Sequence, residues 1–206
     1  MKPRDAAAIV AIDFSGRGPR VLMGQRSARA VFMPGVYVFP GGRVEPADYR
    51  VVPASDFGSH SYERLLCGHG KQLSPAKVRA LGVAALREAR EEAGIVVEAR
   101  GGRGPALDRL VYAARAITPP GQKRIFDTRF FVLDARHISD MREGDGELSG
   151  LGWFRFEEAR TAPLHAITRT ILDHVETRLK YDGMNGLQQR VPCYFKRGAR
   201  FVLAHA

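Results

Sequence analysis

The pattern of hydrophobic and polar positions divides the chain into strands and helices. Short apolar runs predict two antiparallel strands, residues 7–12 and 20–24, joined by a Gly- and Pro-containing turn at 15–19. Apolar runs rich in β-branched and aromatic residues predict further strands and a terminal hairpin. These strands cover residues 36–39, 95–97, 110–117 and 129–133, with the hairpin at 190–195 and 199–203.

Helical spacing of apolar residues appears in two other parts of the chain. Residues 75–93 form the clearer prediction, because Ser74 offers an N-cap hydroxyl, Pro75 suits the first helical position and Gly94 suits the left-handed conformation that closes helices. A second helical stretch opens at 157–159, and apolar residues at 167–179 share one face. Mixed strands with one long helix between them and another near the C-terminus predict an α/β/α sandwich.

Residues 45–73 lack this regularity. Pro, Ser, Gly and His are scattered through the segment, and within it residues 62–66 alone predict a short helical turn. A chain of 206 residues with 45% hydrophobic content is long enough to bury one sizeable core. We therefore expect a single domain, residues 1–206, with an insertion at about 49–73.

Amino-acid composition limits the classes of binding partner and the cellular compartment that we expect for this protein. Lys and Arg outnumber Asp and Glu by 32 to 22, and the net charge of +10 suits anionic partners such as nucleotides, polyphosphates or RNA, although general solubility explains it equally well. Cys67 and Cys193 have no CxxC spacing, so reduced thiols in a cytoplasm fit best. The apolar stretch at 6–12 is too short for a signal sequence or a membrane span, so we expect no membrane partner.

The most informative local feature is acidic. Glu88, Glu91 and Glu92 stand at positions i, i+3 and i+4 of the predicted helix and therefore share one face. Neighbouring like charges repel, and a hard divalent cation bound by their oxygens removes that repulsion. The cluster predicts Mg²⁺ or Mn²⁺ chemistry, with a solvated acidic surface as the alternative.

Two separated segments together resemble the Nudix box. Gly42, in the sequence Phe-Pro-Gly-Gly at 39–42, fits the first glycine of that box. The second half of the box fits Arg87, Glu88, Glu91, Glu92, Gly94 and Ile95. Asp48 stands where the family has Glu, Ala89 stands where it has a bulkier aliphatic residue, and 38 residues separate the halves where the family usually has seven. A long insertion here is typical of one branch, which includes enzymes that hydrolyse coenzyme A and its thioesters.

Two more segments are similar to that insertion-bearing branch. Ile117-Thr118-Pro119, followed by Arg124 and an aromatic strand, resembles its threonine-proline loop. Upstream of the box, Arg26-Ser27, Gly35 and the Phe-Pro-Gly-Gly sequence match its coenzyme A signature. Val31 occupies the position of the second arginine in that signature, with Arg29 two residues earlier.

The resemblance implies a Nudix-type α/β/α sandwich with a mixed sheet, in which the box forms a loop, a helix and a loop. It implies that Glu91 and Glu92 bind the metal, with Glu88 supplying further oxygens. Gly41 and Gly42 allow the backbone to bend close to the ion, where a side chain would obstruct it. Arg87 lies four residues before Glu91 and is expected to orient that carboxylate.

A fourth carboxylate is expected in the charged loop before Trp153. Glu147 lies six residues before this tryptophan, an offset at which family members often place a metal-binding or catalytic glutamate. Glu143 and Asp145 are its rivals, and a solvated loop acid is the alternative for all three. We therefore assign Gly42, Glu88, Glu91, Glu92 and Glu147 to the metal site.

These charges predict a mechanism. Divalent ions on a diphosphate neutralise its oxygens and lower the pKa of bound water, which then attacks. Glu88 or Glu147 is the expected general base. The substrate is expected to be a nucleoside diphosphate linked to a group X, bound by Arg26, Gly41 and Arg124. Coenzyme A or acyl-coenzyme A is favoured modestly over ADP-ribose, NADH or a dinucleotide.

Two other classes of function remain as alternatives. A non-catalytic Nudix domain that binds a nucleotide or RNA is less favoured, because Arg87 and the glutamates are intact. RNA is also disfavoured because no strand interleaves basic and aromatic residues in the manner of RNA-recognition motifs. Relatives are often dimers, so the resemblance gives a weak indication of a homodimer.

Overall fold

The computed structural model describes residues 2–27, 34–68, 72–97, 99, 104–119, 121–122, 124–141, 144–189, 191–197 and 200–204. Its strands are β1 (Arg4–Asp13), β2 (Arg20–Arg26), β3 (Tyr37–Val38), β4 (Gly41–Arg43), β5 (Ile95–Val96), β6 (Leu110–Ile117), β7 (Phe126–Asp134), β8 (Asp140–Met141), β9 (Leu148–Arg155), β10 (Cys193–Arg197) and β11 (Arg200–Ala204). Its helices are α1 (Ser59–Cys67), α2 (Pro75–Ala93), α3 (Phe156–Thr161) and α4 (Ala166–Gln189), with short 3₁₀ turns η1 (Asp48–Arg50), η2 (Leu107–Arg109) and η3 (Ala135–His137).

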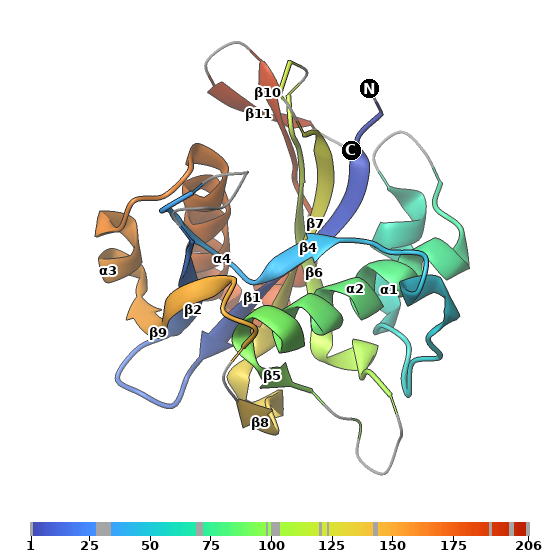
Figure 1. Ribbon diagram of the computed structural model, residues 1–206, viewed down its shortest axis with the longest axis horizontal. Coiled ribbons are helices and arrows are strands. Elements are labelled where there is room, and N and C mark those ends of the chain that lie inside the picture. The colour runs from blue at the N-terminus through green and yellow to red at the C-terminus, as the bar shows by residue number, and fades with distance from the viewer. Residues whose placement is uncertain are drawn as a thin grey trace.

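A mixed sheet forms the centre of the molecule (Figure 1). Among the described residues its strand order is β11-β10-β6-β7-β1-β2-β3. β1 runs parallel to β7, and β10 runs parallel to β6. Two strands share the other edge of β1: β4 pairs with Ala6–Ala8, and β2 pairs with Ile12 and Asp13. The glycines of the Phe-Pro-Gly-Gly sequence are thereby fixed to the central strand.

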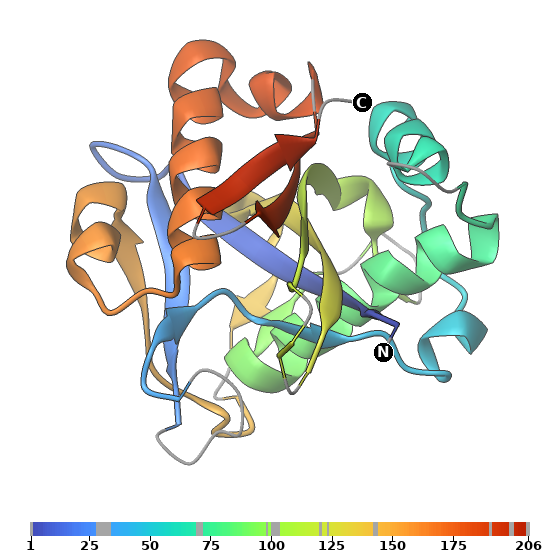
Figure 2. The ribbon, with the colours of Figure 1, turned by 90° about the horizontal axis from the view of Figure 1, so that it is seen from above.

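Helices cover both faces of this sheet (Figure 2). Ala7, Ile9 and Ala11 of β1 belong to the core cluster that contains α1 and α2. The alternate residues Ala8, Val10 and Ile12 belong to the cluster that contains α3 and α4. Because successive side chains of a strand point to opposite faces, β1 is buried on both sides. The predicted α/β sandwich is confirmed.

Local signals fix the ends of α2 where the sequence predicts them. The Ser74 hydroxyl accepts a hydrogen bond from the backbone N–H of Lys77 at 3.3 Å, which satisfies one free donor of the first turn. Gly94 adopts φ of 61°, the left-handed conformation. Its N–H donates to the carbonyl of Arg90 at 3.0 Å.

The structure corrects the prediction for the segment before α2. Instead of a short turn at 62–66, it contains the nine-residue helix α1. Long-range contacts stabilise this region: the ring of Phe57 stacks on Phe131 with centroids 5.3 Å apart, and the backbone N–H of Tyr112 donates to the Ser61 hydroxyl at 3.0 Å. Such contacts leave no periodic signal in the sequence.

The structure also differs from the predicted boundaries of several strands and helices. β7 begins at Phe126, three residues before the predicted strand, because its parallel pairing with β1 extends to Arg4. β3 is limited to Tyr37–Val38, and the second helical stretch is divided into α3 and α4 on either side of Pro163. The terminal hairpin forms from β10 and β11. No helix in the described ranges combines the length and the apolar character that crossing a membrane requires.

Candidate active site

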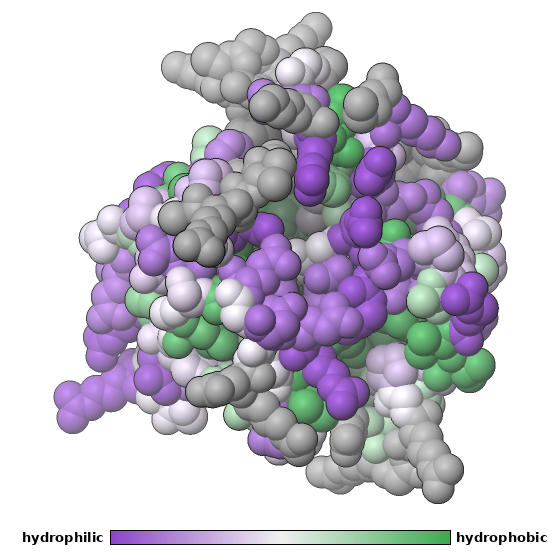
Figure 3. Space-filling view, in the orientation of Figure 1, coloured by the Kyte–Doolittle hydropathy of each residue, from purple (hydrophilic) through white to green (hydrophobic). Residues whose placement is uncertain are grey.

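The C-terminal half of α2 places Glu88 and Glu92 against β4, and Glu91 contacts Arg87 of the same helix. The three glutamates differ in burial: Glu92 is 4% exposed, whereas the side chains of Glu88 and Glu91 are 15% and 48% exposed. Glu147, in the loop before β9, completes the group. We call Glu88, Glu91, Glu92 and Glu147 the carboxylate cluster. Figure 3 shows hydrophilic side chains across the centre of the face where β4 and α2 lie.

Neighbouring atoms lie so close to Gly41 and Gly42 of β4 that neither position has room for a side chain. The backbone N–H of Gly41 donates to Oε2 of Glu92 at 2.7 Å. A Cβ on Gly41 would lie 2.5 Å from the carbonyl oxygen of Ala7, and a Cβ on Gly42 would lie 2.4 Å from Oε1 of Glu88. Any side chain at either position would therefore displace the central strand or a carboxylate of the cluster.

Arg87 connects α2 to the two segments that precede it in the sequence. Its Nη1 donates to Glu88 at 3.0 Å and to Glu91 at 2.9 Å, so the expected contact with Glu91 is present. Its Nη2 donates to the carbonyl oxygen of Arg43 at 3.1 Å. Nε and Nη2 donate to the two carboxyl oxygens of Asp48 at 2.9 and 3.2 Å.

Asp48 is the site residue that sequence reasoning did not assign. It is 2% exposed, and besides Arg87 it accepts the backbone N–H of Glu45 at 2.7 Å. Its position in the box, where the family has Glu, was the available signal. The pairing with Arg87 was not visible because the two residues lie 39 positions apart in the sequence.

The loop before β9 packs on the end of α2. Asp145 donates its backbone N–H to the carbonyl of Glu91 at 2.7 Å, and a Cβ on Gly144 would lie 2.1 Å from the carbonyl oxygen of Glu92. Glu147 follows, with its side chain 2.5 Å from Nη2 of Arg26. Asp145 accepts the backbone N–H of Glu147 at 2.9 Å. Glu143, the other alternative to Glu147 as the fourth carboxylate, lies outside the described residues.

Burial and mutual repulsion perturb the acids of the cluster. Burial raises the pKa of Glu92 to about 8, assisted by the charges of Glu147 and Glu88 and opposed by the bond from Gly41. Burial also raises the pKa of Glu88, against the effect of Arg87. Burial alone would lower the pKa of Arg87, but Asp48 and Glu88 raise it. The cluster thus holds more acid groups than its arginines neutralise, which favours a bound cation.

The donor chemistry of the cluster fits a hard divalent cation, because it consists of carboxylate oxygens beside a glycine backbone. In the described part of the chain, no three His, Cys, Asp or Glu side chains are arranged to hold an ion as they stand. In this arrangement Arg87 pairs with Glu88 and Glu91, and Arg26 pairs with Glu147.

The residues expected to bind substrate lie in two different environments. Arg26 pairs with Glu147 and therefore lies at the rim of the cluster. Arg124 is exposed in the connection between β6 and β7, and within the described chain it forms no ion pair with the cluster. It lies near the start of β1, because the N–H of Arg4 donates to the carbonyl of Ile125 at 2.9 Å. Arg29 and Val31 lie outside the described residues.

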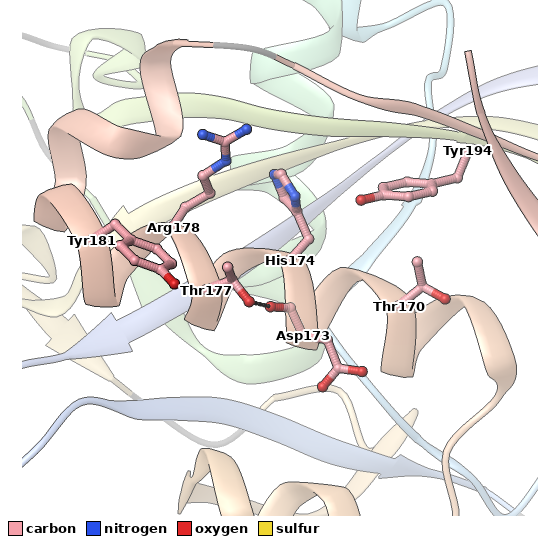
Figure 4. Close-up of a pocket in the computed structure, with 7 residues that line it drawn as sticks. All are labelled: Thr170, Asp173, His174, Thr177, Arg178, Tyr181 and Tyr194. Atoms are coloured by element: carbon pink, nitrogen blue, oxygen red, sulfur yellow. Dashed lines mark hydrogen bonds between the residues drawn. The ribbon is translucent and has the colours of Figure 1, made fainter. Parts of the chain in front are cut away.

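A separate pocket of about 530 Å³ lies on α4 and β10 (Figure 4). His174 lies between Arg178 and Tyr194 there, and burial lowers its pKa to about 4. Asp173, the acid of this pocket, is paired with Arg160 at 2.8 Å. One carboxylate, already paired with an arginine, offers too few free oxygen ligands for a hard divalent cation, so the candidate active site is the carboxylate cluster on the other face of the sheet.

Comparison with known proteins gives one family. Residues 78–175 match the NUDIX domain family, a range that begins inside α2 and does not reach the upstream glycines. A NUDIX hydrolase from Alicyclobacillus acidocaldarius is similar over 84% of this chain and 90% of its own, with 25% sequence identity and a TM-score of 0.67. No curated protein matches the sequence.

Two further solved structures share the fold. The NUDIX domain of Shewanella oneidensis NrtR, in complex with ADP ribose, is 13% identical with a TM-score of 0.57, covering 87% of this chain and 90% of its own. A MutT NUDIX hydrolase from Burkholderia pseudomallei is 20% identical with a TM-score of 0.53, covering 85% of this chain and 99% of its own.

Proposed function

We propose that this chain is a Nudix hydrolase, which uses Mg²⁺ or Mn²⁺ to cleave the diphosphate of a nucleoside diphosphate linked to a second group X. The observation that carries the proposal is the carboxylate cluster beside the Gly41–Gly42 backbone, with Glu92 buried and its pKa raised to about 8. Ionising a buried acid of this kind is costly unless a cation neutralises it.

Glu91 and Glu92 would hold the metal, with Glu88, Glu147 and the backbone at Gly42 completing the site. When bound, divalent ions would neutralise the charge of the diphosphate oxygens and lower the pKa of a bound water molecule. The side chains around the cluster hold its carboxylates in position. Arg87 donates to both Glu88 and Glu91, so it fixes the spacing of these two carboxylates, and Asp48 fixes Arg87 in turn.

Two glutamates are candidates for the general base that takes the proton from water. Glu88 has a pKa raised by burial, which brings it closer to the range in which a base is effective at neutral pH. The Glu147 side chain is 47% exposed and is the more accessible to water. Replacing each with Gln and measuring the pH dependence of kcat/KM distinguishes them, because loss of the base removes the acidic limb of the profile.

Coenzyme A or acyl-coenzyme A is the first substrate to test, on the strength of the Arg26-Ser27, Gly35 and Phe-Pro-Gly-Gly signature. ADP-ribose, NADH and dinucleotides are the alternative, and the ADP-ribose complex of a protein with the same fold supports their inclusion. RNA binding, a homodimer and a cytoplasmic location stay predictions of the sequence.

The experiment is a hydrolysis assay with product masses. Coenzyme A, acyl-coenzyme A, ADP-ribose, NADH, diadenosine polyphosphate and capped RNA are incubated with Mg²⁺ or Mn²⁺ and the protein, and Glu91→Gln serves as the inactive control. Two phosphate monoesters from at least one substrate, absent with Glu91→Gln, are expected. Failure to cleave any of them with either metal would favour a non-catalytic nucleotide- or RNA-binding domain.

A further inference from the structure

A second feature adjoins the carboxylate cluster. A pocket of about 550 Å³ lies between the start of β1, the end of β4 and η1. Its wall includes the cationic residues Lys2, Arg4 and Arg43, together with Tyr49. We call it the basic pocket. Its volume lies within the range of pockets that bind small molecules.

The acids of the basic pocket are already matched by cations. Asp5 pairs with Lys77 at 2.6 Å and with Arg129 at 3.0 Å. Glu45 pairs with Arg43 at 3.2 Å. Lys2 and Arg4 form no ion pair within the described chain. The charges of Lys2 and Arg4 are therefore not neutralised by the acids of the pocket, and both side chains can bind an anionic ligand.

Tyr49 provides an exposed aromatic surface in the same pocket. The residue is 47% exposed, although it directly follows Asp48, which is buried and fixed to Arg87. Its backbone is thus anchored while its ring remains accessible. An exposed aromatic ring beside cations is the combination on which nucleobases stack while their phosphates are neutralised.

The basic pocket begins next to the cluster. Gly42, which abuts Glu88, is followed directly by Arg43, and consecutive Cα atoms lie ~3.8 Å apart. The carbonyl of Arg43 also accepts Nη2 of Arg87. A substrate whose diphosphate lies at the cluster therefore has its nucleoside within reach of this pocket.

We propose that the basic pocket binds the nucleoside half of the substrate and selects nucleosides that carry a phosphate monoester in addition to the diphosphate. Tyr49 stacks on the base, and Lys2 and Arg4 bind the monoester. The inference rests on the proposed function, in which the charge of the diphosphate is neutralised at the cluster. The two cations of the basic pocket then match the roughly −1.5 to −2 charge of one further phosphate.

The test compares substrates that differ by this phosphate alone. We expect kcat/KM to be ~10-fold or more higher for coenzyme A than for dephospho-coenzyme A, and likewise for NADPH than for NADH, as charge-assisted bonds predict. In the variant with Lys2→Ala and Arg4→Ala, both ratios fall toward one. Because each ratio compares two rates of one preparation, partial unfolding of the variant does not change it. Arg17→Ala, which removes an exposed arginine from the turn after β1, keeps the wild-type ratios.

A binding measurement separates this inference from the proposed function. Calorimetric titration without metal is expected to show adenosine 3′,5′-bisphosphate binding ~10-fold or more tighter than AMP, with the difference lost on Lys2→Ala and Arg4→Ala and with both ligands weakened by Tyr49→Leu. Cleavage with ratios near one in the wild type, or ratios unchanged in the double variant, would overturn the inference and leave the proposed function standing. The expected binding difference without cleavage of any substrate would support the pocket and overturn the proposed function.

Discussion

Asp48 and Arg87 form a two-bond ion pair, with Nε donating to Oδ1 at 2.9 Å and Nη2 donating to Oδ2 at 3.2 Å. The pair joins η1 to α2 and so closes the long segment between the halves of the box. Arg87 also holds Glu88 and Glu91, so the position of two carboxylates depends on an aspartate in another element. Arg87 therefore links the two separated segments that resemble the Nudix box.

Replacing Asp48 with Asn should therefore affect both stability and activity. We expect the free energy of unfolding to fall by ~1–3 kcal/mol, because a buried partner of a charged group is lost. We expect kcat to fall ~10-fold or more, since Arg87 no longer fixes Glu91. Urea denaturation and initial rates measure the two effects. Asp56→Asn breaks the exposed pair with Arg79 and should change little, so equal effects of the two variants would contradict this role of Asp48.

Gly42→Ala should disable the site while leaving the fold in place. The added methyl group would lie 2.4 Å from the Glu88 carboxyl, which must then leave its position. We expect kcat/KM to fall ~100-fold, because a displacement of about 1 Å at a catalytic group has that effect. Gly18→Ala is the matched control, since nothing lies within 4 Å of a Cβ there. Wild-type kinetics for Gly42→Ala would refute the contact.

The raised pKa of Glu92 predicts a pH dependence of stability in the absence of metal. Its pKa is about 8 in the folded protein against an ordinary value of 4.5, so the folded state retains a proton that the unfolded state releases between these values. The contribution of Glu92 to the free energy of unfolding is therefore complete below about pH 4.5 and is lost as the pH rises through about 8.

Denaturant titrations with EDTA at pH 5 and pH 8 measure this effect. Glu92→Gln should reduce the loss of stability between the two pH values. The control is Glu157→Gln, which changes an exposed glutamate at the start of α3. An unaltered pH dependence in Glu92→Gln would mean that Glu92 is ionised in the metal-free protein.

Phe57 should be among the residues most important for stability, although it belongs to the segment without periodicity. It is 6% exposed, stacks on Phe131 and would collide with a side chain at Gly82. Phe57→Ala should lower the free energy of unfolding by ~3–5 kcal/mol. A loss below ~1 kcal/mol in urea denaturation, the range of surface substitutions, would show that the segment is peripheral.

The parts of the fold that the sequence predicted are those with local causes. Ser74, Pro75 and Gly94 mark the ends of α2 by their own conformational preferences, and the structure places both ends at the predicted residues. The acidic face follows from the same helix, since its spacing is fixed once the helix is known. These inferences needed no knowledge of any distant residue.

The parts that were missed depend on contacts between distant residues. The length of α1 depends on packing against β6 and α2, which the scattered polar residues of 45–73 do not reveal. The bond from Arg26 to Glu147 joins residues 121 positions apart, so Arg26 was assigned to the substrate and not to a carboxylate. Pattern and spacing along one helix cannot supply either relationship.

The central claim is that the carboxylate cluster binds a divalent metal, and calorimetric titration of Mn²⁺ tests it most directly. The wild-type protein should bind Mn²⁺ with release of protons below about pH 8, where Glu92 of the metal-free protein is protonated and must ionise to accept the ion. Glu91→Gln should weaken this binding at least 10-fold, while Glu157→Gln should leave it unchanged. Mn²⁺ affinity that is the same in wild type and Glu91→Gln would contradict the account.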